Sequence, residues 1–311
     1  MAGVTPFEPV VELEEKTTQK HRSLWGDVWR QFRKHKGAMV GATILTLIVI
    51  TTLIGPFIYT VDPGHLDVLA ANQGPTSEHP LGTDNLGRDM LAQVLTGGRI
   101  SIAVGVSAMM LAISLGVLVG IGAGYFPALD SPLMRLTDMF LALPLLPLLL
   151  VCIMLFRDTL RAWIGPERGI FLLIVTMIGI TSWMQTARVV RGEVLTVKEQ
   201  EFVLAANSIG TRRYRVVWRH ILPNVLSPVM VAATLGIANA IITESALSFL
   251  GLGFPSDFPT WGRLLFDGKD FMSLTPTRVI WPGLAISLTV LCVNFIGDGL
   301  RDALDPRLRG R

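Results

Sequence analysis

Few side chains in this chain of 311 residues could carry out covalent chemistry. All five histidines fall outside the long apolar stretches: His21, His35, His65, His79 and His220. The two cysteines, Cys152 and Cys292, lie inside such stretches, where a free cysteine usually acts as a small buried hydrophobe. The sequence has no His-Glu-x-x-His zinc motif and no G-x-x-x-x-G-K-S/T phosphate loop. We therefore expect no catalytic residue and no metal site in this chain.

A few ionisable and polar side chains lie within apolar stretches. Glu244 is well inside one of them, and a carboxylate in lipid costs a few kcal/mol, so it should face protein groups or water. Asn239 and Asn294 are candidate polar partners. Two roles fit this group of three: lining or switching a pathway, or pinning helices together. Asp138 lies one turn after Arg135, which predicts an ion pair between them.

The composition indicates elements that cross a membrane. Half of the residues are hydrophobic and 16% are charged, whereas a soluble domain has about 25% charged residues. A spanning helix needs about 20 apolar residues. Six blocks qualify or come close: 38–59, 100–126, 133–156, 170–183, 225–250 and 279–300. The sequence therefore predicts an all-α, polytopic membrane protein with six transmembrane helices.

Two of these blocks contain residues that shape a helix bundle. Gly116, Gly120 and Gly124 recur every four residues in the second block, a spacing that lets helices approach closely in lipid. Pro144 and Pro147 interrupt the third block, which is tolerated where neighbouring protein satisfies the freed backbone groups. Both features fit a bundle around a pathway, and both also fit ordinary helix packing.

The distribution of basic residues predicts the orientation. Of the 27 Lys and Arg residues, 19 lie in the terminal segments and in the connections on the same side, and 8 lie in the opposite connections. Basic residues concentrate on the cytoplasmic side of a membrane. Both termini and the loop 184–224 are therefore predicted to be cytoplasmic, and 60–99 extracytoplasmic. The segment 24–36, with tryptophans and basic residues, fits either an amphipathic helix at the membrane surface or a solvated basic segment that leads into the first span.

The cytoplasmic loop has the pattern of a short helix. Thr196 and Glu199 fit a capping box, and Gly210 fits a left-handed helix end. Four residues fall on one face between them: Phe202, Ala205, Ala206 and Ile209. A basic stretch follows. This predicts a helix over 199–210 whose small-residue face docks into a groove of another protein.

This loop resembles the "EAA" signature of permeases in type I ABC importers. The signature reads Glu-Ala-Ala, three residues, Gly, nine residues, Ile-x-Leu-Pro. Five residues stand in register with it: Ala205, Ala206, Gly210, Leu222 and Pro223. Leu204 and His220 stand where the family usually has Glu and Ile. The resemblance implies that 199–210 is a coupling helix for partner ATPases, with Glu201 and the five matched residues as its coupling set.

Three further segments narrow the family. PLGTDNLGRDML at 80–91, ESALSFLGLG at 244–253 and GDGLRDALDPRLRGR at 297–311 resemble permeases of peptide and nickel importers of the DppC/OppC type. In the first segment, Asp84, Arg88 and Asp89 are either candidate contacts for a solute-binding protein or members of a structured turn. The resemblance covers nearly the whole chain from about residue 24.

The resemblance implies a division of the chain and a set of partners. It implies a cytoplasmic segment 1–37, a first helix 38–59, an extracytoplasmic segment 60–99, a five-helix core 100–304 and a tail 305–311. The implied partners are a second related permease, two cytoplasmic P-loop ATPases and an extracytoplasmic solute-binding protein. The chain itself would bind no cofactor, because ATP and Mg²⁺ would belong to the ATPases.

The implied activity is ATP-driven import across the cytoplasmic membrane by alternating access, with a di- or oligopeptide as solute. A nickel complex, glutathione or another small solute stays open. The alternative is a stand-alone secondary transporter or channel. Such folds commonly contain two related halves, and the sequence shows no clear internal repeat. An ion gradient that sufficed for transport by the purified chain would favour the alternative.

Overall fold

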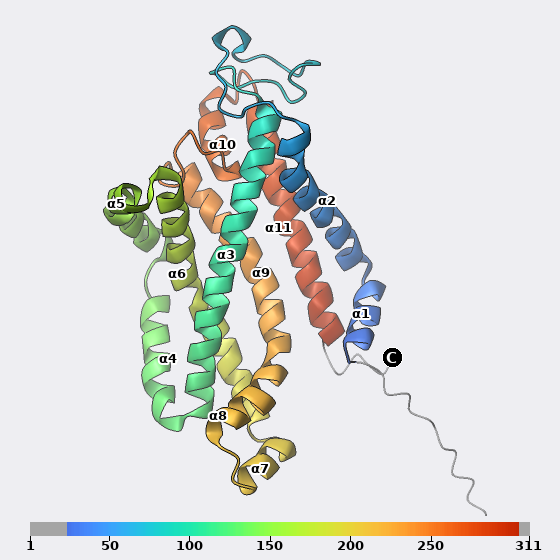
Figure 1. Ribbon diagram of the computed structural model, residues 1–311, viewed down its shortest axis with the longest axis vertical. Helices are drawn as coiled ribbons and strands as arrows, with labels where there is room; N and C mark the ends of the chain where they lie inside the picture. The colour runs from blue at the N-terminus through green and yellow to red at the C-terminus, as the bar shows by residue number, and fades with distance from the viewer. Residues whose placement is uncertain (1–23, 305–311) are drawn as a thin grey trace, which may run out of the picture.

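The computed structural model describes residues 24–304 as a helical bundle (Figure 1). Five helices in this part of the chain are long and apolar enough to cross a membrane: α2 (Lys36–Ile58), α3 (Met90–Tyr125), α6 (Pro166–Val197), α9 (Leu222–Phe249) and α11 (Thr277–Leu304). Shorter helices connect them: α1 (Leu24–Lys34), α4 (Pro127–Leu141), α5 (Leu145–Ile164), α7 (Glu201–Ser208), α8 (Arg213–Val216) and α10 (Trp261–Gly268). Short helical turns occur at η1 (Val68–Ala70), η2 (Val217–Ile221) and η3 (Lys269–Phe271). The predicted all-α, multi-span fold is confirmed.

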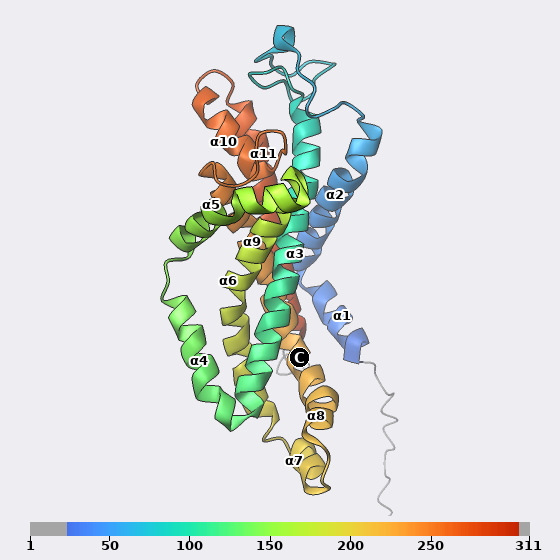
Figure 2. The ribbon, with the colours of Figure 1, turned by 60° about the vertical axis from the view of Figure 1, so that its left-hand side comes forward.

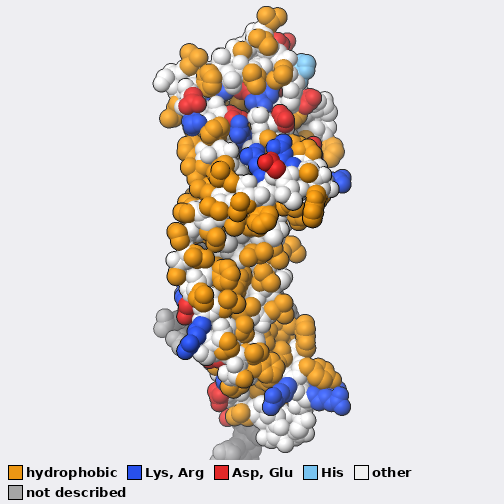
Figure 3. Space-filling model, turned by 90° about the vertical axis from the view of Figure 1, so that its left-hand side faces the viewer, with side chains coloured by type: hydrophobic (Ala, Val, Ile, Leu, Met, Phe, Trp, Pro, Cys, Tyr) orange, Lys and Arg blue, Asp and Glu red, His pale blue; other side chains and the backbone are white. Residues whose placement is uncertain are grey.

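The surface separates into an apolar band and two charged ends. In Figure 3, orange hydrophobic side chains cover the middle of the visible face, and blue and red side chains gather toward its two ends. Exposed Leu47, Leu118 and Leu288 come from three different spanning helices. Apolar side chains on the outside of a bundle are stable only when lipid or another protein covers them. This distribution fits a bundle that crosses a bilayer.

The third predicted span is the main difference from a simple row of six helices. It consists of α4 and α5, which are bent by 85° at a short break, so that α5 lies across the bundle (Figure 2). Pro144 stands at the N-cap of α5 in an extended conformation, a position at which its missing N–H removes no hydrogen bond from the helix. Pro147 lies within α5. A single continuous span over 133–156 is therefore corrected to a broken one.

Two other boundaries differ from the sequence-based prediction. The helix α3 begins at Met90, so residues 90–99 of the predicted external segment are helical. The helix α6 continues to Val197, so that the first part of the predicted loop 184–224 is also helical. Hydropathy marks only the apolar part of a helix, whereas the backbone hydrogen bonds continue beyond it. Both long helices therefore project past their apolar stretches.

The close contact of α3 with α6 forms the centre of the bundle. A Cβ added at Gly116 would lie 2.6 Å from Cβ of Thr186, and one added at Gly120 would lie 2.6 Å from Cβ of Val190. At Gly124 it would lie 2.7 Å from Cβ of Val194. All three glycines of the four-residue repeat therefore face α6, which confirms the predicted close approach. We call these three glycines the glycine seam.

Ion pairs join α4 to α6 near one end of the bundle. The carboxylate of Asp130 accepts hydrogen bonds from Nε and Nη2 of Arg191, at 2.5 and 2.7 Å. Arg188 Nη2 donates to Asp138 Oδ1 at 2.5 Å. The predicted local pair between Arg135 and Asp138 is therefore wrong. Arg188 on the neighbouring helix reaches the carboxylate instead.

Gly120→Ala is expected to lower the stability of the protein. The new methyl group would meet Ala187 O at 2.7 Å as well as Val190, and overpacking of this kind costs about 1–3 kcal/mol. Gly122→Ala is the matched control, because its Cβ would meet only Leu133 Cδ1, at 3.4 Å. The midpoint of thermal unfolding of the purified proteins measures the effect. Equal midpoints for the two variants would contradict a tight glycine seam.

Candidate functional site

The loop between α6 and α9 contains the predicted coupling helix as α7. The helix covers Glu201–Ser208 and is preceded by Gln200, whose side chain makes no capping hydrogen bond. Thr196 still belongs to α6, where its hydroxyl donates to Gly192 O at 3.2 Å. The predicted capping box of Thr196 with Glu199 is therefore wrong. The extension of α6 to Val197 includes Thr196. The helix α7 therefore begins at Glu201, two residues later than predicted.

The end of α7 has the predicted left-handed geometry. Gly210 has a φ of +76°, a conformation that glycine adopts without the strain of a Cβ atom. Its N–H donates to Asn207 O at 3.0 Å, and the N–H of Thr211 donates to Ala206 O at 3.1 Å. This pair of bonds is a Schellman motif. It ends the helix sharply and turns the chain back toward α8.

The faces of α7 divide differently from the prediction. Val203 and Ala206 are buried against the rest of the chain, whereas Ala205 is exposed. Ile209 is 82% exposed. Of the predicted face, Phe202, Ala205 and Ile209 are exposed, whereas Ala206 belongs to the inner face. Besides Ile209, the same loop exposes four large apolar side chains: Phe202, Leu204, Tyr214 and Trp218. We call this exposed set the tip surface.

Val203 connects the tip surface to the spanning helices. It belongs to one cluster of buried residues with Val190 and Val194 of α6 and with Val225 and Val229 of α9. The cluster therefore packs α7 against both spanning helices. Figures 1 and 2 show α7 beyond the ends of α3 and α4, where another protein can reach it.

The segment that joins α7 to α9 is helical from Arg213 onward. Val217–Ile221 form a π-helical turn, and Arg213–Phe249 continue as one long helix through it. The matched motif residues Leu222 and Pro223 occupy the first turn after it. Proline is tolerated there because the π turn directly before it already interrupts the regular α-helical hydrogen bonds. Glu201 lies in the first turn of α7 and is exposed.

Glu244 is fully buried in α9, with a relative exposure of 0%. Ser248 Oγ donates to its Oε1 at 2.7 Å, and Ser101 Oγ of α3 donates to its Oε2 at 3.2 Å. The N–H of Trp261 donates to Ser101 Oγ at 3.2 Å, and Thr260 Oγ1 lies 3.5 Å from Ser248 Oγ. The carboxyl group thus joins α3, α9 and the start of α10. We call this group the hydroxyl cage.

The predicted partners of Glu244 are therefore corrected. Asn239 is exposed and lines a cavity of about 720 Å³ between α4, α5, α6 and α9. Asn294 is half-buried on α11 and belongs neither to the hydroxyl cage nor to the lining of that cavity. Of the three residues, only Asn239 opens onto a space that a solute could occupy. The lining includes Gln185, Ser182 and Thr243 and has no charged side chain.

The external segment between α2 and α3 folds around Asp84, Arg88 and Asp89. The side chain of Asp84 accepts hydrogen bonds from Arg88 Nε at 2.6 Å and from the N–H of Leu86 at 2.8 Å. Arg88 Nη1 also donates to Ser256 O at 3.0 Å. All three residues are buried. The structured turn is therefore confirmed. Because the three side chains face the interior, they are not placed to contact a binding protein directly.

Asp89 also holds the outer end of α2. It caps α3 by accepting the N–H of Ala92 at 2.7 Å, and it accepts the hydroxyl of Tyr59 at 2.8 Å. Burial, with the hydrogen bond to Asp89, raises the pKa of Tyr59 to about 12. The phenol therefore stays protonated and donates near neutral pH.

Several residues of these groups were not predicted. Arg278 donates to Asn72 Oδ1 at 3.2 Å and to Asn85 Oδ1 at 2.7 Å, which ties the external segment to α11. Arg278 could have been recognised from the sequence, because it is a charged residue at the start of an apolar stretch. Ser248 lies four residues after Glu244, one helical turn away, and could have been recognised. Ser101 is distant in sequence and required the structure.

Comparison with known proteins places the chain among transport proteins. The profile of the family described as "Binding-protein-dependent transport system inner membrane component" matches residues 91–310. The profile described as "N-terminal TM domain of oligopeptide transport permease C" matches residues 23–75.

Three comparisons describe the similarity. The oligopeptide transport system permease protein OppC of Bacillus subtilis is 39% identical over 308 residues, covering 97% of each chain. The dipeptide transport system permease protein DppC of Alkalihalophilus pseudofirmus is 36% identical over 288 residues, covering 92% of this chain and 91% of the relative. A chain of the inward-facing MetNI methionine ABC transporter shares the fold, with a TM-score of 0.56 at 15% identity over 70% of this chain and 98% of that chain.

Glu244→Ala is expected to destabilise the protein more than Glu244→Gln. Alanine leaves a cavity and unpaired hydroxyls, at a cost of about 2–4 kcal/mol, whereas glutamine keeps the volume and one acceptor oxygen. Ser114→Ala is the control, because that hydroxyl bonds only to Met110 O within its own helix. Thermal unfolding and transport rate are measured together. Wild-type stability and transport in both Glu244 variants would refute a structural or functional role of the hydroxyl cage.

Proposed function

The chain belongs to the family of binding-protein-dependent transport system inner membrane components, and we propose that it carries di- or oligopeptides inward across the cytoplasmic membrane. It is the permease subunit of an ABC importer, a class that works with ATPases and a solute-binding protein.

Support for a peptide solute comes from both parts of the chain. The profile over residues 23–75 is named for an oligopeptide permease, and the relatives with 36–39% identity are oligopeptide and dipeptide permeases. The cavity beside Asn239 also fits such a solute. Its volume of about 720 Å³ lies within the range of about 300–1,000 Å³ for small-molecule sites. Amide and hydroxyl groups in its lining can form hydrogen bonds with a peptide backbone.

The tip surface is the proposed docking site for a cytoplasmic ATPase. Ile209 and its apolar neighbours are left exposed by the residues that the structure describes. A groove in an ATPase would bury them and gain the free energy of apolar burial. The position of Val203 between α6 and α9 then lets α7 act as a rigid lever. Both helices also line the cavity, so ATPase motion would reshape it and alternate its access.

The proposed complex contains a second related permease, two P-loop ATPases and an extracytoplasmic binding protein. In this arrangement the chain itself does no covalent chemistry, and ATP and Mg²⁺ are bound by the ATPase subunits. Both termini and α7 lie in the cytoplasm, as the excess of basic residues in those segments favours. The binding protein would contact exposed residues of the external segment rather than the buried Asp84, Arg88 and Asp89.

The exposed apolar tip of α7 is the observation that carries this proposal. Ile209→Asp in the tagged full-length chain, expressed in its own cells, is expected to reduce the recovery of P-loop ATPases in a mild-detergent pull-down. The charged group would be buried without a partner in the groove, which costs several kcal/mol. Mass spectrometry of the recovered proteins measures the loss.

Leu69→Asp is the matched control for this experiment. Leu69 is 94% exposed and lies in η1 at the other end of the molecule. The control should recover the ATPases and the second permease as well as the wild type does. Recovery of the chain alone from wild-type membranes that contain ATPases would refute the importer complex and favour a stand-alone transporter.

Gly210→Val is expected to weaken the coupling of ATP hydrolysis to transport. A β-branched residue in the left-handed conformation costs roughly 1–2 kcal/mol or more, and α7 would end differently. Gly210→Asn should retain more activity, because asparagine tolerates this conformation. Gly192→Val is a second control, since its Cβ would meet no atom within 4 Å. Solute-stimulated ATPase activity of the reconstituted complex is measured, and normal stimulation in Gly210→Val would oppose the coupling role.

A further inference from the structure

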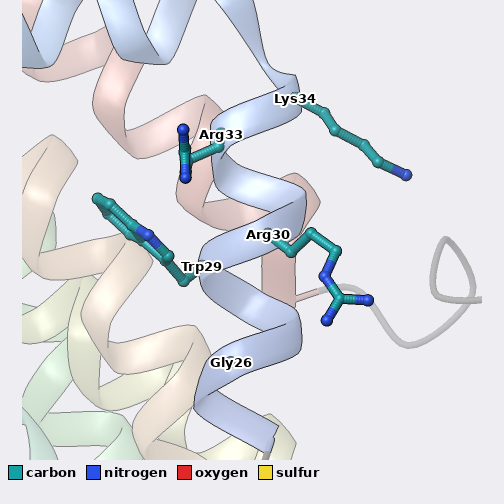
Figure 4. A pocket seen from close by; sticks show the side chains of 5 residues that line it. All are labelled: Gly26, Trp29, Arg30, Arg33 and Lys34. Carbon is teal, nitrogen blue, oxygen red and sulfur yellow. The ribbon is translucent and has the colours of Figure 1, made fainter.

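The helix α1 has one face that packs against the bundle and another that does not. On the packed face Val28 is buried, and Phe32 lies beside Gly299 of α11, where an added Cβ would be 3.3 Å from the ring. The open face carries a shallow groove of about 520 Å³. Five residues line it: Gly26, Trp29, Arg30, Arg33 and Lys34. We call this groove the α1 groove (Figure 4).

The α1 groove combines positive charge with an aromatic surface. Arg33 and Lys34 are exposed, and neither forms an ion pair with any side chain that the structure describes. Trp29 is 57% exposed, and its ring stacks on that of Phe32 with centroids 5.9 Å apart. In Figure 4, Trp29 and Arg33 extend to one side of α1, and Arg30 and Lys34 extend to the other. Cations therefore flank the groove on both sides of α1, and Trp29 lies on the side of Arg33.

The helix α1 directly precedes a membrane-spanning helix. Only His35 separates α1 from the spanning helix α2, and its Nδ1 accepts the N–H of Ala38 as a cap. Residues at this junction lie where α2 leaves the hydrocarbon, at the level of the lipid headgroups. Tryptophan is enriched at that level, and arginine and lysine there attract anionic lipids of the cytoplasmic leaflet.

We propose that the α1 groove binds the headgroup of an anionic phospholipid. The phosphate would lie in the groove between the positive charges of Arg33 and Lys34, and the indole of Trp29 would lie at the boundary between headgroup and acyl chains. Charge complementarity favours this occupant over a neutral lipid. The spanning helix α2, which directly follows α1, favours a lipid over a soluble protein. The surface suited to a soluble partner is the tip surface, and Figure 1 shows α7 in another part of the molecule.

Lipid retention by the full-length chain tests the proposal. The chain is purified in mild detergent and mixed with equal amounts of phosphatidylglycerol and phosphatidylcholine, and bound lipids are counted by native mass spectrometry. Wild type should retain phosphatidylglycerol in preference. The double variant Arg33→Gln with Lys34→Gln should reduce that preference by on the order of tenfold, because it lacks two positive charges that attract the anionic headgroup.

Two matched variants separate lipid binding from misfolding and from general charge loss. Arg33→Lys with Lys34→Arg keeps both charges and should retain phosphatidylglycerol. Arg161→Gln with Arg168→Gln removes two charges near the junction of α5 and α6 and should also retain it. Three results would overturn the proposal: no preference in wild type, an equal loss in the α5–α6 control, or displacement of the lipid by millimolar inorganic phosphate.

Discussion

The close approach of α3 and α6 is the interaction on which the rest of the bundle depends. Lipid offers no hydrophobic force that pushes helices together, so packing must hold them. The glycine seam lets the two backbones approach until side chains of α6 fill the space of the missing Cβ atoms. The buried cluster that includes Val190 and Val194 then forms along the same face of α6, and it receives Val203 of α7. Without the seam, α7 would have no fixed support.

Polar groups inside the bundle serve a similar purpose at the end that carries α10. The hydroxyl cage around Glu244 ties α3 and α9 to the start of α10, and Arg88 and Arg278 tie the external segment to the loop before α10 and to α11. Buried polar groups must find partners within the protein. That end is therefore held by hydrogen bonds, whereas the middle is held by van der Waals contact. The cavity beside Asn239 lies among α3, α4, α5, α6 and α9.

The sequence predicted those features that depend on local patterns. The spanning helices, the left-handed end at Gly210 and the glycine seam follow from hydropathy, residue type and spacing, which act over one or two helical turns. Features that depend on contacts between distant segments could not be predicted. Glu244 is held by Ser101 from another helix, and Asp138 pairs with Arg188 across a helix contact. The inner position of Ala206 likewise depends on how α7 is rotated against α6 and α9.

The π-helical turn at Val217–Ile221 has a consequence for the geometry of the long helix that contains it. A π turn accommodates one residue more than an α turn. Each residue of an α-helix advances by about 100° around the axis. The residues before the turn are therefore out of angular phase with those after it by about that amount. The orientation of α7 about the axis of α9 is thus set by a count of residues, and a deletion in this turn would rotate the tip rather than shorten it.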